Sequence, residues 1–236
     1  MQLVVSDVYL MEGLRGANVY LLNSGNSLTL VDSGLGREAD LIIAQIQDAG
    51  YALSSLHTIV LTHAHGDHTG GAAELARCTG ARVLTHREEA PYIEMTKPLP
   101  TASLFQRVML WLGDKIMLKN SPCRVDRHLE DGDTVEALGG MQVIHTPGHT
   151  PGSICLYHAE RKILFCGDAL FNANPMTGKP GFRLPVPVAT LDNTQARDSV
   201  ERLSNLAVEV LCCGHGEPIL EKAGEKIKAL LMEVNS

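Results

Sequence analysis

The sequence predicts an α/β fold in which mixed β-sheets are flanked by helices. Short apolar runs that are typical of strands alternate along the chain with segments whose apolar residues recur at helical spacing. The chain has 236 residues, 44% of them hydrophobic, which is enough for a substantial core. Neither a short-period repeat nor a linker divides the sequence, so we expect a single domain over residues 1–236.

The first part of the chain favours strands followed by a helix. Strand-like apolar runs occupy residues 3–5, 18–22 and 27–31. The last two flank residues 23–26, whose Asn, Ser and Gly content favours a hairpin. Ala39, Ile42 and Ile46 then recur at helical spacing, and Gly50 follows as a stop. This pattern predicts an amphipathic helix that packs on a sheet.

A dense cluster of metal-ligand residue types lies at residues 62–71, directly after a strand-like run. His63 and His65 are two positions apart, so an extended loop can bring both to one ion. Asp67 and His68 lie where small residues open a helix, and they can turn toward a second ion. Neutral imidazole and carboxylate suit zinc and similar divalent metals. A surface loop that is merely rich in histidine is the alternative interpretation.

The rest of the chain continues the alternation and supplies further ligand types. Strand-like runs follow at residues 82–85, 141–144, 153–157, 163–167 and 208–214, and helical spacing at residues 72–76, 196–203 and 227–234. His149 lies in a loop rich in Pro and Gly, while Asp168 and His215 each follow a strand-like run directly. Both halves of the chain therefore contribute ligand types, which predicts one domain made of two similar lobes.

Two segments depart from this alternation. Residues 98–120 form an apolar helical insertion with the only tryptophan, Trp111. A helix that is apolar on several faces must be covered. It can pack inside the domain, form a wall or lid over an apolar substrate pocket, or make a homodimer contact. Residues 171–190 are rich in Asn, Gly and Pro and predict a long irregular loop at the rim of the pocket.

The composition restricts the partners and surroundings of the chain. The formal net charge is -7 and no Lys/Arg cluster is present, so we expect no nucleic-acid partner. The start lacks the pattern of a targeting segment, and no run of about 18 apolar residues occurs, so we expect no membrane partner. Four of the 6 cysteines lie in strand-like runs, which predicts reduced core thiols in a cytoplasmic protein.

Taken in chain order, the seven candidate ligands spell H-x-H-x-D-H, then H, then D, then H. The sequence thereby resembles the metallo-β-lactamase-fold superfamily from about residue 19 to residue 215. This resemblance implies a four-layer αββα sandwich of two mixed β-sheets with helices outside, and a metal centre at one edge. It implies two zinc ions, with iron or manganese as alternatives. The first ion would bind His63, His65 and His149, the second Asp67, His68 and His215, and Asp168 would bridge them.

The resemblance also implies a reaction, the hydrolysis of an ester-like bond. A metal-bridging hydroxide would attack a lactone, a thioester or another carboxylic or phosphoric ester. Asp67, beside the second ion, would orient the water and take its proton. Asp32, at the end of a strand-like run, would support a metal-bound histidine from behind. A cap on the following helix or turn is the alternative role for Asp32.

Differences from individual branches narrow the substrate. The commoner zinc β-lactamases carry Cys at the place of Asp168, whereas glyoxalase II-like thioesterases share the Gly-Asp-Ala-Leu-Phe motif of residues 167–171. The basic residues with which those thioesterases bind glutathione have no convincing counterpart here. Acyl-homoserine-lactone lactonases share all seven ligands but usually carry Tyr where this chain has Phe171. Phe171 and Trp111 are our candidates for the substrate pocket.

We therefore expect a metal-dependent hydrolase of a small-molecule ester, from a glyoxalase II-like or lactonase-like branch. An acyl-homoserine-lactone lactonase is one alternative. A mononuclear-iron sulfur oxygenase, similar to persulfide dioxygenases, is the alternative from another reaction class. It would use only His63, His65, His149 and Asp168. Residue types alone do not separate one iron from two zinc ions, because metal loading follows availability as well as ligand chemistry.

Overall fold

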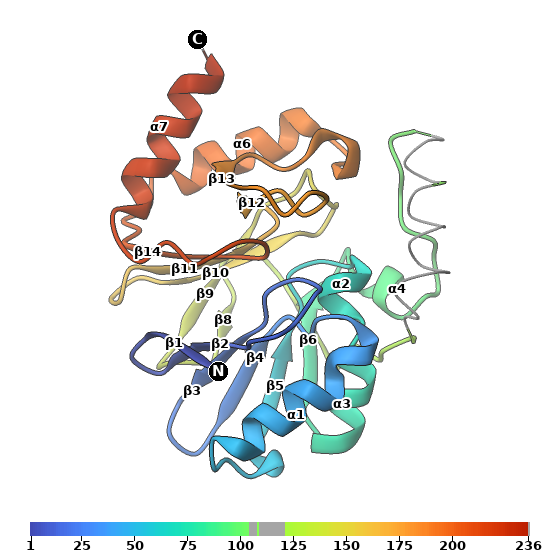
Figure 1. The fold of residues 1–236 in the computed structure, drawn as a ribbon. Helices are drawn as coiled ribbons and strands as arrows, with labels where there is room; N and C mark the ends of the chain where they lie inside the picture. Colours follow the sequence, from blue (N-terminus) through green and yellow to red (C-terminus); the bar gives the residue numbers. More distant parts are fainter. Residues whose placement is uncertain (104–107, 109–120, 236) are drawn as a thin grey trace.

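Two β-sheets lie face to face, and helices cover the outer side of each (Figure 1). The computed structural model describes residues 1–103, 108 and 121–235 of the chain. The predicted α/β class is confirmed, since both sheets are mixed and both carry helices. The apolar insertion predicted at residues 98–120 falls largely outside the described residues. Trp111, the predicted pocket residue, is among those that are not described.

The first sheet is built from the N-terminal part of the chain. Its strands are β1 (Gln2–Val5), β2 (Val8–Leu10), β3 (Tyr20–Asn23), β4 (Leu28–Val31), β5 (Leu56–Val60), β6 (Arg82–His86) and β7 (Arg127–Leu129). They pair in sequence order, antiparallel from β1 to β4 and parallel from β4 to β7. The hairpin predicted around residues 23–26 joins β3 and β4. Because β5 and β6 are parallel, their C-terminal ends lie at the same edge of the sheet.

Helices connect the parallel strands of the first sheet. They are α1 (Ala39–Asp48), α2 (Gly66–Thr69), α3 (Ala72–Thr79) and α4 (Ala90–Ile93), with single 3₁₀ turns at Gly36–Glu38 and Leu53–Ser55. Ile42 and Ile46, whose spacing predicts the first helix, are fully buried, and each contributes about 1.5–3 kcal/mol by leaving water. Gly50 has a positive φ just beyond α1, as expected of a stop.

The second sheet comes from the C-terminal part of the chain. Its strands are β8 (Thr134–Val135), β9 (Met141–His145), β10 (Ile154–His158), β11 (Ile163–Gly167) and β14 (Val210–Cys213), in the order β14-β11-β10-β9-β8. Strands β11 and β14 are parallel and the others antiparallel. Helices α6 (Asn193–Leu203) and α7 (Ala223–Asn235) cover its outer face (Figure 1). The Asp192 carboxylate accepts from the backbone N–H groups of Thr194 and Gln195 and so caps α6.

The prediction of an irregular loop at residues 171–190 is partly wrong. The segment contains a small antiparallel pair, β12 (Phe171–Ala173) and β13 (Pro180–Arg183), followed by a 3₁₀ turn at Pro187–Ala189. The Asn174 side chain closes the turn of this hairpin by accepting the backbone N–H groups of Met176 and Thr177. Such short strands carry no apolar alternation, so the sequence pattern could not reveal them.

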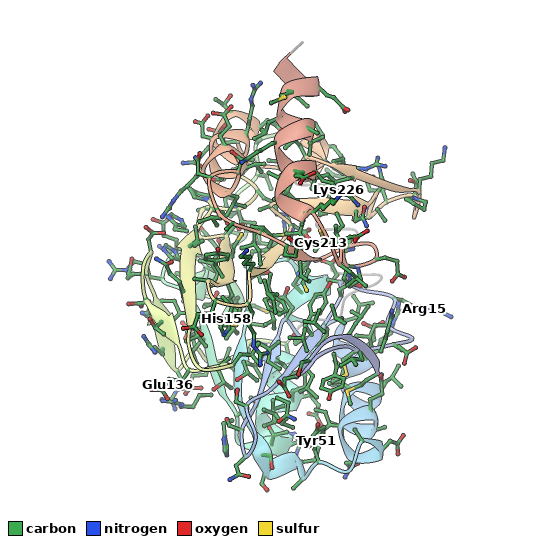
Figure 2. All side chains as sticks on the ribbon, turned by 90° about the vertical axis from the view of Figure 1, so that its left-hand side faces the viewer. Arg15, Tyr51, Glu136, His158, Cys213 and Lys226 are labelled. Atoms are coloured by element: carbon green, nitrogen blue, oxygen red, sulfur yellow. The ribbon has the colours of Figure 1, made fainter. Side chains whose placement is uncertain are left out.

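Apolar side chains form three layers. The first, between the first sheet and its helices, includes Leu30, Ile42, Ile59 and Leu75. The second, between the two sheets, includes Leu22, Val60, Leu156 and Phe165. The third, beneath α6 and α7, includes Leu164, Val200, Leu211 and Ile227. Figure 2 shows side chains filling the space between the sheets. Three apolar layers separate four structural layers, so the predicted αββα sandwich is confirmed.

No helix in the described part of the chain is both long and apolar enough to cross a membrane. The 6 cysteines are all free, five of them buried and Cys78 exposed. The four cysteines predicted in the core, Cys155, Cys166, Cys212 and Cys213, are indeed buried, and Cys123 is buried as well.

Candidate metal centre

The seven predicted ligands meet at strand ends of both sheets. His63 and His65 lie in the loop after β5, Asp67 and His68 lie on α2, and His149 lies in the loop between β9 and β10. Asp168 and His215 follow β11 and β14. Two groups result, each with its ligand-type atoms within 4.8 Å of one another: His63, His65, His149 and Asp168 form the first group, and Asp67, His68 and His215 form the second. Residues from four separate segments thus converge on one place.

The first group has three imidazole nitrogens facing one another. The Nδ1 atom of His65 lies 3.2 Å from Nε2 of His63 and 3.0 Å from Nε2 of His149. The Oδ2 atom of Asp168 lies 3.8 Å from Nε2 of His63 and 3.5 Å from Nε2 of His149. Tetrahedral zinc with ligands at about 2.0–2.1 Å requires ligand atoms about 3.3–3.4 Å apart. The observed separations bracket this value, so the group matches a zinc-sized ion.

The second group joins the first through Asp168. The Nε2 atom of His215 lies 3.3 Å from Oδ2 of Asp67 and 3.6 Å from Oδ2 of Asp168. The other oxygen of Asp168, Oδ1, lies 3.2 Å from Nε2 of His68. Asp168 therefore contacts both groups and is 6% exposed. A carboxylate in this position can be shared between two ions.

Three imidazoles form a hydrogen bond through Nδ1, the ring nitrogen that points away from the centre, and this bond determines that Nε2 faces the centre. The Asp32 carboxylate accepts from Nδ1 of His68 at 2.8 Å. The Thr62 hydroxyl donates its hydrogen to Asp32. The Oγ1 atom of Thr62 is therefore free to accept from Nδ1 of His63, which lies 3.1 Å away. In the neutral form of these three histidines, including His149 described below, the partner at Nδ1 fixes the proton there and leaves Nε2 as the unprotonated nitrogen that is aimed inward. An unprotonated nitrogen is the form that binds a metal.

Thr190 gives His149 the same arrangement. Its hydroxyl donates to the Val186 carbonyl at 3.0 Å, so its oxygen accepts from Nδ1 of His149 at 3.2 Å. Asp32, the predicted supporting residue, is 2% exposed and has a left-handed backbone with φ 62°. Its Oδ1 also accepts the backbone N–H of Thr62, and the Thr62 hydroxyl lies within hydrogen-bond distance of both Asp32 oxygens. Asp32 therefore ties the loop after β5 to α2 as well as holding His68.

Two buried polar atoms at the centre lack a hydrogen-bond partner among the described residues. They are Nε2 of His68 and Oδ1 of Asp168, which face each other across the second group. Leaving a buried polar atom unpaired costs about 1–3 kcal/mol. A cation bound between an imidazole lone pair and a carboxylate oxygen would satisfy both atoms at once. The donor set between His68 and Asp168 therefore fits a cation.

Electrostatics in the metal-free chain follow from this crowding. Burial and the neighbouring His149 lower the pKa of His65 to about 3. Burial works against the charge on His215, but Asp168 and Asp67 outweigh it and raise its pKa to about 9. Burial disfavours the Asp168 carboxylate as well, yet His68 and His215 hold its pKa well below the ordinary value. At neutral pH the metal-free centre thus contains a neutral His65, a protonated His215 and ionised carboxylates, and a metal ion would have to displace the proton of His215.

One side of the centre is open. The side chain of Asp67 is 31% exposed and that of His215 is 12% exposed. His65 is also partly exposed, whereas His63, His68 and His149 are buried. Among the described residues of the centre, Asp67, His65 and His215 are therefore the ones that solvent reaches. Arg15, on the loop beside Asp67, directs its side chain outward at the edge of the molecule (Figure 2).

Phe171 packs against the candidate ligands His149 and His215 from the interior of the protein. It is fully buried, with its ring centroid 5.5 Å from that of His215 and 6.2 Å from that of His149. In the metal-free chain it backs these two imidazoles with apolar surface, which excludes water from behind them. Contact between Phe171 and a substrate stays a prediction, as does the pocket role of Trp111.

Several residues that shape the centre carry no pattern in the sequence. Thr62 and Thr190 orient imidazoles, and Asn18 donates from its side-chain amide to the carbonyls of Cys213 and Gly216, on both sides of His215. Gly214 is required by space, since a Cβ there would lie 2.3 Å from Oδ1 of Asp168. Thr62 directly precedes His63, so a search for polar residues next to ligands would have found it. The others are distant in sequence from the residues they support.

A third cluster with ligand-type atoms within 4.8 Å consists of His86, Glu88 and His145. The rings of His86 and His145 are stacked, with centroids 4.1 Å apart and an interplanar angle of 9°. A bound ion lies close to the plane of each imidazole that binds it. Parallel stacked rings have no common plane in which an ion can sit. We therefore assign no ion to this cluster.

Comparisons with known proteins agree with this centre. A family model described as the Metallo-beta-lactamase superfamily matches residues 13–215. The chain is 29% identical over 219 residues to the protein named "Probable metallo-hydrolase YflN" of Bacillus subtilis (strain 168), covering 87% of this chain and 83% of that protein. It is 37% identical over 159 residues to hydroxyacylglutathione hydrolase of Pseudomonas aeruginosa (strain LESB58), covering 66% of this chain and 48% of that protein.

A solved structure has the same fold. The metallo-beta-lactamase family protein TTHA1429 from Thermus thermophilus matches with a TM-score of 0.72 over 99% of this chain and 81% of that chain, at 24% identity. At this identity the likeness concerns the fold alone. The family model spans most of the chain and includes all seven candidate ligands. The chain therefore belongs to the metallo-beta-lactamase superfamily.

Proposed function

We propose that the chain is a metal-dependent hydrolase that binds two divalent ions, preferably zinc, and cleaves an ester-like bond in a small molecule. The observation that carries the proposal is the sharing of buried Asp168 between two adjacent groups of imidazoles and carboxylates. Relatives named metallo-hydrolase and hydroxyacylglutathione hydrolase support this reaction class. Lactones, thioesters and other carboxylic or phosphoric esters are the candidate substrates.

Divalent ions at this centre would polarise the substrate oxygen and lower the pKa of water to about 7, so that hydroxide is available at neutral pH. The chain's own residues provide the setting. His63, His68 and His149 are held rigidly from behind, which keeps the ligand atoms in place without reorganisation. The open side past Asp67 admits the substrate, and buried Phe171 closes the rear.

Asp67 is the residue best placed to move a proton. Burial acts to raise its pKa, but His68 and His215 outweigh that effect and hold the pKa below the ordinary value, so the carboxylate is ionised. It is the most exposed carboxylate of the centre, and its Oδ2 lies 3.3 Å from His215. An ionised carboxylate at the open side can orient an attacking water and accept its proton.

The test is proton release from a panel of lactones, thioesters, aryl esters and phosphodiesters, measured with a pH indicator. The zinc-loaded chain is compared with the variant Asp168→Ala. Release that disappears in the variant supports the hydrolase, and the best substrate identifies the branch, including a lactonase. A zinc-loaded chain that releases no protons from any substrate contradicts the proposal as stated. The iron-loaded form would then be tested for sulfur oxygenation, the alternative reaction class.

A further inference from the structure

Glu89 is a buried carboxylate that the proposed reaction does not use. It lies after β6, directly before helix α4, and is 0% exposed. No Lys or Arg of the described chain forms an ion pair with it. Burying an ionised carboxylate without a cationic partner is costly unless hydrogen bonds compensate. Burial accordingly raises the pKa of Glu89, while hydrogen bonds from Gly152, Thr150 and Ala64 act in the opposite sense.

The donors to Glu89 come from two different ligand loops. Its Oε2 accepts the backbone N–H of Ala64 at 2.7 Å, and its Oε1 accepts the backbone N–H of Gly152 at 2.6 Å. The Thr150 hydroxyl is its third partner. Ala64 stands between His63 and His65, and Thr150 follows His149 directly. One carboxylate therefore links the loop after β5 to the loop between β9 and β10.

The two backbone bonds have the short lengths of charge-assisted hydrogen bonds. Each of these two bonds ends on a different oxygen of Glu89. Because both partners are N–H donors, the side chain must offer two acceptor atoms. A glutamine would offer one acceptor and would direct its NH₂ group at the other N–H. The close approach also requires glycine at position 152, where a Cβ would lie 3.0 Å from Cγ of Glu89 and 2.8 Å from Nδ1 of His86.

The spacing of the first group depends on these same two loops. His65 and His149 lie 84 positions apart in sequence, yet their ligand atoms are 3.0 Å apart. His63 and His65 lie in a loop that follows a strand of the first sheet, whereas His149 lies in a loop between two strands of the second sheet. Between these loops, the carboxylate of Glu89 accepts one backbone hydrogen bond from each loop.

We propose that Glu89 is a positioning residue, which holds the loops of His63, His65 and His149 at the separation that the first ion needs. The inference rests on the metal-binding part of the proposed function and not on the reaction. Glu89 belongs to neither ligand group. It acts through the backbone on both sides of the ligands. Loss of such outer partners typically weakens metal binding by about 10–100-fold.

The experiment compares Glu89→Gln with Glu88→Gln, which makes the same change at the exposed neighbour. Each protein is freed of metal and titrated with Co²⁺ and with Zn²⁺ against a chromophoric chelator, well below its melting temperature. We expect Glu89→Gln to bind one of the two ions about 10–100-fold more weakly and the other as before. The visible absorption of the Co²⁺ form should change for that same ion. Glu88→Gln should match the original chain.

The apo melting temperature separates positioning from mere structural support. A structural role would lower that temperature and leave the affinity of the folded chain unchanged at both ions, which would overturn the proposal. Should Glu89→Gln fail to fold, Gly152→Ala tests the contact from the other loop and should weaken the same ion. Two bound ions without hydrolysis would contradict the proposed function alone. Equal affinities in the original chain and Glu89→Gln would contradict this inference alone.

Discussion

The Nε2 atom of His149 lies 3.0 Å from the Nδ1 atom of His65, although these residues come from loops of opposite sheets. The His63 Nε2 atom lies 3.2 Å from the same Nδ1 atom. Three imidazole lone pairs cannot approach so closely in a stable arrangement unless protons or a cation lie between them. The centre is therefore assembled by the packing of the two sheets. The side chains in it are expected to contribute differently to metal binding and to catalysis.

Removing one ligand from each group should remove one ion at a time. We expect His149→Ala to lose the first ion and keep the second, and His215→Ala to do the reverse, because each imidazole belongs to one group. Either change should lower kcat/KM by more than about 100-fold, the loss seen when one electrostatic stabiliser is removed. Metal stoichiometry by elemental analysis is the measurement. His128→Ala, an exposed histidine, is the matched control. Loss of both ions in both variants would contradict two separable groups.

Asp168→Asn should differ from either histidine variant. The amide keeps the size of the side chain but removes the charge that faces both groups. We expect binding of both ions to weaken and hydrolysis to fall below detection, since the first group loses its one carboxylate and the second keeps only that of Asp67. Isothermal titration of the apo variant with Zn²⁺ measures the two affinities. If one ion bound with unchanged affinity, Asp168 would not be shared.

Asp67→Asn distinguishes a proton acceptor from a ligand. An asparagine at this position can still contact His215, but it cannot accept a proton. If Asp67 is the acceptor, both ions stay bound while kcat falls by about 10²–10⁴-fold. The measurement combines metal content with the pH dependence of kcat. Full activity with both ions present would show that the carboxylate is not needed as a base.

Asp32→Asn should weaken the second ion and the fold together. Its oxygens accept from Thr62 and from Nδ1 of His68, and an amide cannot accept all of these bonds. We expect about 10–100-fold weaker metal binding at His68. The free energy of unfolding of the apo chain should drop by about 1–3 kcal/mol. Asp40→Asn, at an exposed helical position, is the control for both measurements. An unchanged affinity in a destabilised chain would reduce Asp32 to a structural role.

The Asp131–Arg202 pair predicts a pH dependence of stability. The hydrogen bond from Arg202 holds the pKa of Asp131 below its ordinary value of 3.8. A depressed folded-state pKa means that the stabilisation is present above the ordinary value and is lost as pH falls through the lowered one. Asp131→Asn should therefore be less stable at neutral pH by about 0.2–1 kcal/mol, the range of exposed pairs, with the difference fading in acid.

Urea unfolding of the metal-free proteins between pH 2 and pH 7 measures this difference without interference from metal loss. Glu136→Gln serves as a control, because it removes a carboxylate for which no ion pair is found among the described residues. A difference between Asp131→Asn and the original chain that stays constant with pH would show that the carboxylate charge is not responsible.

Much of this protein could be predicted from the order of its residues. Apolar runs and helical spacing are local properties, so they indicated most strands and the helix at Ala39–Asp48. Asp168 and His215 directly follow strand-like runs, and the order of all seven ligand types resembles the family pattern, so their convergence was predictable too. The hairpin of β12 and β13 was missed because its strands are too short to show alternation.

The tertiary structure decided what lies between distant segments. The sequence does not indicate that His65 faces the centre through Nδ1 while His63 and His149 use Nε2, because that choice depends on rear partners such as Thr190. It equally gives no sign that Glu89 joins two ligand loops. Residue types and local spacing determined the kinds of ligand and the fold class. The packing of one sheet on the other determined distances, tautomers and supporting contacts, because these arise only where segments far apart in sequence meet.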